Sequence, residues 1–224
     1  MLGLYVTVPI ACFRKGLARE YLETEALPPP ATCYGFLLSL VGETDRNRHV
    51  GCRVTAALLG QPDKSMVLRT VWRIKSKKLP MGSGNNRSLA QQEILTGVQL
   101  VLWLDSGEET IERPTLEQRV REALLHPEKI DRFGGLCLGE STHLVDEVKL
   151  FEGDATQEGA IFLLQERGQL TLPVWVDHVG SEGTRYVTGE LKPSPLLPPE
   201  ILRLPKIESS IPVTKPSRRK KRDG

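Results

Sequence analysis

Apolar and polar side chains alternate over several short stretches of the chain, which is the period-2 pattern of β-strands with one buried face. In the first stretch, Leu2, Leu4, Val6 and Val8 alternate with glycine and more polar residues. Pro173 interrupts one of the later stretches and confines it to a sheet edge or a bulge. The stretches that predict strands are residues 2–8, 52–58, 66–74, 94–104, 142–151, 161–165, 170–176 and 185–191.

A first helix is predicted after the three prolines at 28–30, with Thr32 as its N-cap. Apolar residues then cover nearly the whole helical circumference up to Gly42, which predicts a buried helix that ends at this glycine. Gly35 lowers the helix propensity by about 1 kcal/mol relative to alanine. We therefore expect another backbone to approach the helix closely at Gly35.

A second helix is predicted from Thr115, which forms a capping box with Gln118 in front of an apolar stripe. The resulting order of strands and helices is β-α-β-β-α-β, the arrangement of ferredoxin-like and RNA-recognition domains. We predict an α+β fold with a ferredoxin-like domain over residues 1–151 and a small antiparallel β-rich part over 152–207. Residues 208–224 are rich in Lys, Arg, Ser and Pro and are predicted to form a disordered basic tail.

Basic residues are concentrated in one internal segment, although the net charge of the whole chain is only +2. Residues 64–92 contain Lys and Arg but neither Asp nor Glu, which indicates a polyanionic partner. Lysines that protect a sheet edge are the alternative. Residues 76–92 have turn composition without apolar periodicity, so we predict a projecting basic hairpin over about 75–93. The candidate polyanion-binding cations in and beside it are Arg73, Lys75, Lys77, Lys78 and Arg87.

Composition excludes several other classes of protein. No apolar run reaches the roughly 20 residues that span a bilayer, and residues 2–12 lack the basic leader of a signal peptide. The four cysteines form no CxxC pair, so we expect reduced thiols in a cytoplasmic protein. Neither a metal site nor a cofactor is predicted.

Two further segments have the chemistry of an RNA-binding surface. The connection after the first strand contains Arg14, Lys15, Arg19 and Tyr21, a combination that suits phosphate neutralisation and base stacking. An ordinary solvated loop is the alternative for this connection.

The second segment is residues 132–151, with the sequence RFGGLCLGESTHLVDEVKLF. Glycine permits positive φ and close backbone approach, so this loop is predicted to receive a protein or polynucleotide partner. A tight turn between helix and strand is the alternative. The residues that carry this prediction are Gly134, Gly135, Gly139, Glu140, Ser141 and His143.

Three segments of the chain resemble the Cas-five family of the RAMP superfamily. They are YVTVPIACFRKGLAREYLETEALPPPATCYGFLLSLVGE, VLRTVWRIKSKKLP and the glycine-rich segment 132–151. The resemblance covers residues 1–191 and is greatest to the branch found in type I-B CRISPR systems. It implies a ferredoxin-like domain with a thumb and a small β-rich C-terminal part.

The resemblance also implies a function, which is binding of the 5′ handle of CRISPR RNA (crRNA) in a type I surveillance complex, Cascade. Such a subunit caps the handle, contacts the Cascade backbone subunit and the large subunit, and meets target DNA only through the assembled complex. By position in the family, Thr32 and Tyr34 join the first-strand exit and the glycine loop in holding the handle. The thumb is implied to wedge beside the crRNA and the next subunit.

Two alternatives to this function remain at the level of the sequence. One branch of the family cleaves precursor crRNA without a metal, and His143, Tyr21 and Lys15 or Lys75 are the residues that such an endoribonuclease would use. The four histidines are scattered, so we expect no catalytic residue and a separate processing nuclease. A scaffold without RNA contact is the second alternative, and it leaves the basic segment unexplained.

Overall fold

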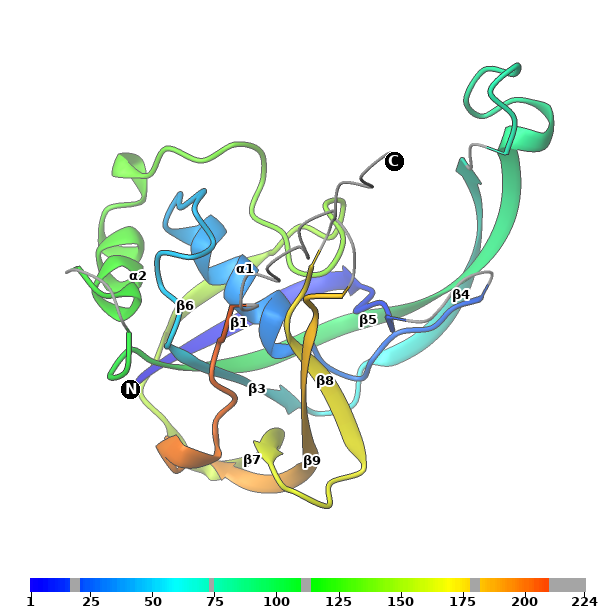
Figure 1. Ribbon diagram of the computed structural model, residues 1–224. Helices are drawn as coiled ribbons and strands as arrows, with labels where there is room; N and C mark the ends of the chain where they lie inside the picture. Colours follow the sequence, from blue (N-terminus) through cyan, green and yellow to red (C-terminus); the bar gives the residue numbers. More distant parts are fainter. Residues whose placement is uncertain (17–20, 73–74, 110–113, 178–181, 210–224) are drawn as a thin grey trace, which may run out of the picture.

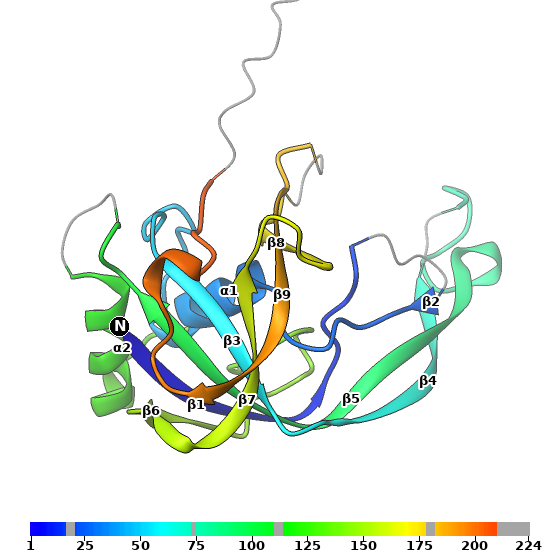
Figure 2. The same ribbon diagram turned by 90° about the horizontal axis from the view of Figure 1, so that it is seen from below.

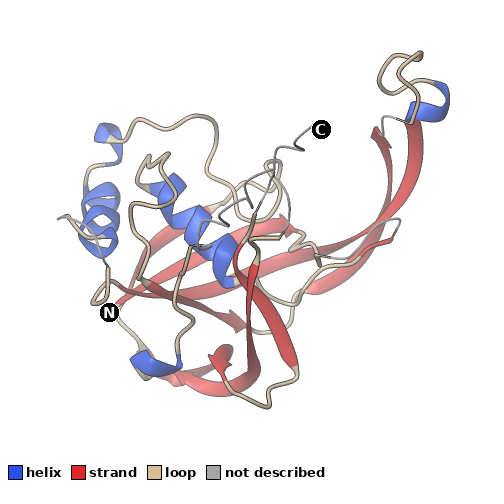
Figure 3. Ribbon diagram, viewed as in Figure 1, coloured by secondary structure: helices blue, strands red, loops and turns tan. Residues whose placement is uncertain are grey.

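The computed structural model of the protein describes residues 1–16, 21–72, 75–109, 114–177 and 182–209. These residues form a mostly antiparallel β-sheet with two α-helices (Figures 1 and 3). None of the helices that they form is long and apolar enough to cross a membrane. The strands are β1 (Leu2–Ala11), β2 (Tyr21–Leu22), β3 (Arg53–Leu59), β4 (Asp63–Trp72), β5 (Arg87–Asp105), β6 (Glu147–Phe151), β7 (Asp154–Leu164), β8 (Leu170–Trp175) and β9 (Arg185–Leu196). The helices are α1 (Pro30–Leu40) and α2 (Leu116–Leu125), with short 3-10 turns η1 (Gly84–Asn86), η2 (Pro127–Lys129) and η3 (Ile201–Arg203).

The strands follow the order β6-β1-β5-β3-β7-β9-β8, while β2 and β4 pair with β5 outside this path. β1 lies antiparallel between β6 and β5, with Leu4 opposite both Leu150 and Leu102. The side chains at alternate positions of β1 and β5, such as Leu4 and Leu102, are fully buried in the larger core cluster that also contains the buried residues of both helices. Figure 2 shows α1 lying within the curve of the sheet.

The opposite face of β5 is also covered in the body of the protein. Val101 and Trp103 belong to a second core cluster, together with Ile161 of β7 and Leu204 after η3. Because both faces of this part of β5 are buried, its residues form an almost continuous apolar run, as central strands do.

α1 begins at Pro30, with Pro29 as N-cap residue and no side-chain cap. The prediction that Thr32 caps the helix is therefore wrong. Thr32 lies in the first turn, where its N–H donates to the Pro29 carbonyl at 2.8 Å. Proline at the first helical position has its φ already set for the helix, so no capping side chain is required there. The predicted end at Gly42 is confirmed, since Gly42 follows the C-cap residue with φ +66.

α2 has the capping box that the sequence predicts. The Thr115 hydroxyl accepts from the Gln118 N–H at 3.4 Å, and the Gln118 side chain accepts from the Thr115 N–H at 3.0 Å. Leu116, Val120 and Ala123 form its buried stripe.

β4 and residues 87–96 of β5 form a long hairpin that projects from the body (Figure 1). The sequence predicted a third strand with one buried face and a thumb that begins only at about residue 75. The strand itself is confirmed as far as Trp72, but all of β4 belongs to the hairpin and its Leu68–Trp72 face is not buried. Leu68 and Trp72 are 66% and 67% exposed. Alternation tells which side chains share a face, and it does not tell what covers that face.

β6 begins at Glu147 rather than at the predicted residue 142. Residues before it form a turn instead, in which the His143 N–H donates to the Glu140 carbonyl at 2.9 Å. Three glycines and a hydroxyl-rich tetrapeptide favour such a turn over a strand ladder.

The C-terminal strands extend the same sheet, because β7 pairs with β3 through Ala57 and Leu58. β8 lies at the end of the strand order and has a register shift after Pro173, as predicted for this proline. Residues 205–207 then return to the beginning of β3, where the Val54 N–H donates to the Pro205 carbonyl at 3.0 Å. Most of the predicted tail, residues 210–224, lies outside the described residues.

Candidate nucleic-acid interface

The exit of β1 lies beside the base of the hairpin. Arg14 forms a backbone bridge with Thr24, and the Lys15 ammonium lies 3.7 Å from the Glu23 carboxylate. The Tyr21 hydroxyl, on β2, donates to Glu93 of β5 at 3.1 Å, and this hydrogen bond raises the pKa of Tyr21. Three predicted residues, Arg14, Lys15 and Tyr21, thus lie in one short connection, while Arg19 is outside the described residues.

Glu93 organises this connection, and the sequence reasoning missed it. Its carboxylate accepts from the Thr24 N–H at 3.0 Å and from Lys64 at 3.3 Å, as well as from Tyr21. The hydrogen bond from Thr24 lowers the pKa of Glu93 most, while burial opposes the shift. The signal in the sequence was Glu93 itself, the first acidic residue after the acid-free basic segment.

The glycine loop docks onto the end of β1 through Gly139. Gly139 has φ +105, and a Cβ there would lie 2.9 Å from the Cys12 carbonyl oxygen. The backbone that approaches this glycine is therefore the protein's own. Gly134 has φ +78 and open space beside it, whereas a Cβ on Gly135 would lie 2.9 Å from Leu144.

His143 holds this docked arrangement through its ring. Its Nδ1 accepts from the Cys12 N–H and from the Glu140 N–H, both at 3.2 Å, so the ring proton resides on Nε2. Burial lowers the pKa of His143, and the nearby Arg69 lowers it further, against the opposing effect of Glu140. His143 is thus a neutral residue that joins the loop to β1.

Glu140 links the loop to the hairpin. Its carboxylate accepts from Arg69 of β4 at 2.7 Å and from the Gln92 amide of β5 at 2.9 Å, and Arg69 also donates to Gln92. We name Arg69, Gln92 and Glu140 the hairpin clasp. The carboxylate of the predicted site residue Glu140 is therefore hydrogen-bonded to other residues of the protein. Ser141 beside it is exposed.

α1 contributes the other two predicted residues, Thr32 and Tyr34, which line one pocket together with Gly139. Tyr34 is only 3% exposed, and its hydroxyl donates to the Arg46 carbonyl at 2.8 Å. Burial raises the pKa of Tyr34. The Arg46 guanidinium lies over the Trp175 ring, 3.8 Å from its centroid. Neither Arg46 nor Trp175 was predicted, because only the fold brings β8 over α1.

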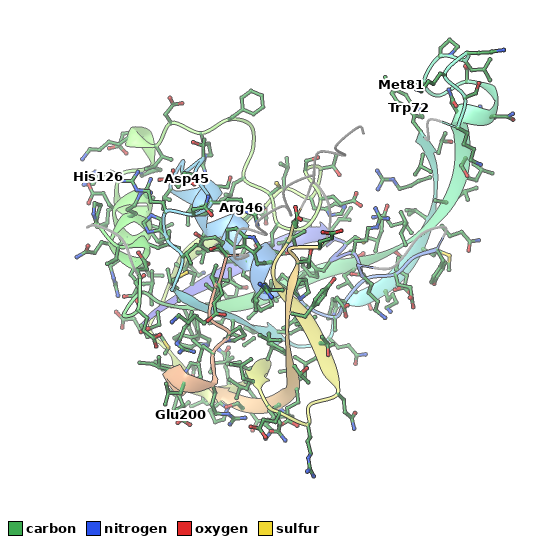
Figure 4. All side chains as sticks on the ribbon, viewed as in Figure 1. Asp45, Arg46, Trp72, Met81, His126 and Glu200 are labelled. Carbon is green, nitrogen blue, oxygen red and sulfur yellow. The ribbon has the colours of Figure 1, made fainter. Side chains whose placement is uncertain are left out.

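The hairpin tip is an ordered loop built on Asn86, which is 1% exposed. The side-chain oxygen Oδ1 of Asn86 accepts from the Lys75 and Ser76 N–H groups at 2.8 and 2.9 Å, and its Nδ2 donates to the Ser76 and Leu79 carbonyls. Trp72 and Met81 lie beside this loop (Figure 4). Lys75, Lys77, Lys78 and Arg87 are exposed there, and Arg73 lies outside the described residues.

The body contains a buried polar cluster that the sequence did not reveal. His49 Nδ1 lies 2.8 Å from Glu109, its Nε2 lies 2.9 Å from Arg119, and Arg119 pairs with Glu43 at 2.5 Å. We name these four residues the body cluster. Within the described part of the chain, no group of three or more His, Cys, Asp or Glu side chains could hold a metal ion.

Comparison with solved structures identifies proteins with a similar fold. No family model matches the chain. A chain in a solved structure described as a "CRISPR RNA-guided surveillance complex" has a TM-score of 0.59 at 12% identity, over 89% of this chain and 92% of that one. A second, described as "Crystal structure of Cas protein", has a TM-score of 0.48 at 12% identity, over 92% and 97%. The protein therefore has the fold of a chain found in an RNA-guided surveillance complex.

Sequence similarity then identifies the family. The chain is 52% identical over 208 residues to the CRISPR-associated protein Cas5 of Myxococcus xanthus (strain DK1622). The matched residues cover 92% of this chain and 97% of that protein. The protein belongs to the Cas5 family, which confirms the resemblance of its sequence motifs.

Proposed function

We propose that this protein is a non-catalytic subunit of a type I CRISPR surveillance complex, Cascade. In this role it binds and caps the crRNA 5′ handle and joins the backbone filament to the large subunit. Target DNA is contacted only through the assembled complex, in the cytoplasm. Membership of the Cas5 family and the fold shared with a surveillance-complex chain support this proposal.

The observation that carries the assembly part of the proposal is the exposed hairpin. Met66, Leu68, Trp72 and Leu89 are each more than half exposed along it. Exposed apolar side chains in such number mark a surface that a partner covers. We assign this surface to the neighbouring backbone subunit and the crRNA beside it, with Lys75, Lys77 and Lys78 at the tip for phosphate groups.

The strand order also supports a ferredoxin-like description of residues 1–151. β6-β1-β5-β3 is a four-stranded antiparallel unit in which α1 follows β1 and α2 follows β5. Residues 152–207 form the small β-rich part, whose strands continue from β3.

The absence of catalysis is supported by the state of the candidate side chains. A metal-independent endoribonuclease requires a general base within hydrogen-bond reach of the 2′-hydroxyl. His143 uses Nδ1 to accept two backbone N–H groups, and its Nε2 carries the proton. The Tyr21 hydroxyl is bound to Glu93, and the Lys15 ammonium lies beside Glu23. None of these three is set up to accept the 2′-hydroxyl proton.

Purification with the co-expressed operon tests the binding role. Sequencing of the bound RNA is expected to recover crRNAs that share one 5′ end. Random cellular RNA, or no RNA, would contradict the proposed function.

A separate incubation of the purified protein with repeat-containing RNA, without divalent metal, tests the enzymatic alternative. No discrete cleavage is expected. Cleavage at the handle boundary that His143→Ala abolishes would show that the protein is the processing nuclease instead.

A further inference from the structure

Open space at a residue does not by itself indicate a binding site. The close backbone contact expected at Gly35 of α1 is not present, because a Cβ built on this glycine meets no atom of the described residues within 4 Å. Solvent alone can fill such a space. Large apolar side chains that are held in solvent as a group are a stronger indication of a partner, since soluble proteins rarely expose large apolar patches.

A group of this kind surrounds the 3-10 turn η3, in the short segment 195–202. Leu197, Ile201 and Leu202 are 47%, 43% and 70% exposed there. Pro195 and Pro198 are exposed in the same segment. We name these five residues the η3 surface.

The η3 surface is anchored, because the chain is buried on both sides of it. Leu196 and Leu204 both belong to the second core cluster. Gly153, between β6 and β7, approaches the segment so closely that a Cβ there would lie 3.4 Å from Leu197 and 3.5 Å from Pro198. A partner that covers these side chains therefore meets a preformed surface and has little additional ordering to impose on it.

The η3 surface and the hairpin lie at opposite ends of the molecule. Figure 4 shows Glu200, which immediately precedes η3, far from the labelled Trp72 and Met81 of the hairpin. In Figure 2, the orange turn that follows β9 likewise lies on the side away from β4. The two surfaces are therefore accessible to two different subunits at the same time.

The charge around the η3 surface is negative. Segments 152–160 and 193–202 lie side by side where β7 pairs with β9. They contain neither Lys nor Arg, and their acidic residues are Glu152, Asp154, Glu158 and Glu200. Lys192 and Arg203 border the second segment, and Lys192 is already paired with Glu190 at 2.5 Å. The surface therefore combines exposed apolar side chains with an excess of carboxylates.

This charge decides between the possible kinds of partner. RNA phosphates would be repelled by the carboxylates, so the η3 surface is unsuited to RNA. A second copy of the chain in a symmetric dimer would bring the same acidic residues against one another, which is also unfavourable. An apolar pocket with Lys or Arg at its rim, on a different protein, is complementary in both respects.

We propose that the η3 surface is the docking site for the large subunit, which presents an apolar pocket with basic side chains at its rim. Leu197 and Leu202 enter the pocket, while Glu158 and Glu200 pair with the rim. Because the proposed function assigns the hairpin to the backbone subunit, the large subunit is the partner left for this opposite end. The inference rests on the proposed function and names the surface through which the protein holds its second subunit.

The test uses the complex of the full chain, the backbone subunit and crRNA, onto which the purified large subunit is titrated. Leu197→Ser with Leu202→Ser is expected to weaken the affinity for the large subunit about tenfold or more, because the apolar burial is lost. Leu125→Ser with Leu150→Ser changes two similarly exposed leucines elsewhere and is the matched control, with natural affinity expected. Thermal unfolding checks that both variants are folded.

The charge of the surface is tested separately. The affinity of the natural complex for the large subunit is expected to fall as the salt concentration rises, because salt screens the paired charges. Glu158→Lys with Glu200→Lys is expected to weaken the affinity and to remove this salt dependence. Glu128→Lys with Glu166→Lys makes the same change of charge at exposed positions outside the two acidic segments and is expected to bind as the natural chain does.

Natural affinity for the large subunit in the double serine variant overturns the inference, and so does an affinity that neither salt nor the double lysine variant changes. Loss of the backbone subunit or of crRNA from the double serine variant, with the large subunit retained, would assign the η3 surface to those partners and also overturns it. A dimer of the natural chain that this variant abolishes would have the same consequence. A natural complex that binds no large subunit, or that contains no crRNA, would instead remove the proposed function itself.

Discussion

The two halves of β5 are one continuous strand in two different environments. Residues 100–104 lie between β1 and β3 with both faces covered, and Leu100 and Leu102 are completely buried. Residues 87–96 pair with β4 in the projecting hairpin, where Leu89 is 61% exposed. Gly97, with φ +71, separates the halves. Similar local patterns therefore stabilise the fold in one half and leave apolar side chains exposed in the other.

The polar clusters of the body and of the hairpin also differ in how deeply they are buried. The body cluster is buried, with the side chains of His49 and Glu109 each 1% exposed. The hairpin clasp is partly solvated, since the side chains of Arg69 and Glu140 are 43% and 27% exposed. Buried pairs are strongly destabilising to break, whereas solvated pairs contribute little. The body is thus stabilised by its interior, whereas the hairpin clasp is expected to contribute little to stability.

Truncation of equivalent leucines gives the largest expected difference between the regions. Leu102→Ala is expected to lower the free energy of unfolding by about 2–5 kcal/mol, because it leaves a cavity between helices and sheet. Leu68→Ala in the hairpin is expected to change it by less than about 0.5 kcal/mol. Urea unfolding of both variants measures the two effects. A loss of more than about 2 kcal/mol in Leu68→Ala would show that the hairpin face is covered in the free protein.

Removal of one carboxylate from each polar cluster gives the second comparison. Burial alone raises the pKa of Glu43, but hydrogen bonds from the Asp45 N–H and from Arg119, with the charge of Arg119 and Arg48, lower it to about 2. A folded-state pKa below the ordinary 4.5 contributes stability above pH 4.5, which is lost as the pH falls towards 2. Glu43→Gln should therefore cost roughly 3 kcal/mol at pH 7, at about 1.4 kcal/mol per pKa unit.

Glu140→Gln in the hairpin clasp is the counterpart and is expected to cost at most about 1 kcal/mol. Thermal unfolding of the natural protein and both variants between pH 2 and 7 measures these differences. The Glu43→Gln deficit should shrink as the pH falls below 4.5. A deficit that does not depend on pH would mean that Glu43 acts by packing rather than by charge.

Replacement of the cations of each region gives the smallest effect, and it appears in binding rather than in stability. Arg14→Ala with Lys15→Ala, in the body, is expected to weaken handle binding and to flatten its salt dependence by about 0.7 per lost phosphate contact. Alanine at Lys75, Lys77 and Lys78 is expected to weaken assembly with the backbone subunit more than binding of an isolated handle oligonucleotide. Titrations at several salt concentrations and pull-down of the backbone subunit measure both variants. Equal behaviour in both assays would remove the functional division between body and hairpin.

Local features were predictable from the sequence because their causes are local. The capping box of α2 depends on two residues three positions apart, and Gly42 ends α1 through its own backbone freedom. The alternation of residues 2–8 likewise describes the first part of β1, where Leu2, Leu4, Val6 and Val8 all reach the core. The Cas5 family was also visible in motifs that a few adjacent residues carry.

Features that depend on distant parts of the chain were not predictable. The sequence determined that Met66, Leu68 and Trp72 share one face of a strand, but only the tertiary structure shows that these three side chains are exposed among the described residues. The sequence offered His143 as a candidate site residue, but only the fold shows that the Cys12 N–H donates to its Nδ1. Arg46 and Trp175 meet only because β8 folds over α1. The physical reason is common to all three. Backbone preferences and side-chain periodicity act over a few residues, whereas burial and hydrogen-bond partners depend on segments that are far apart in the chain.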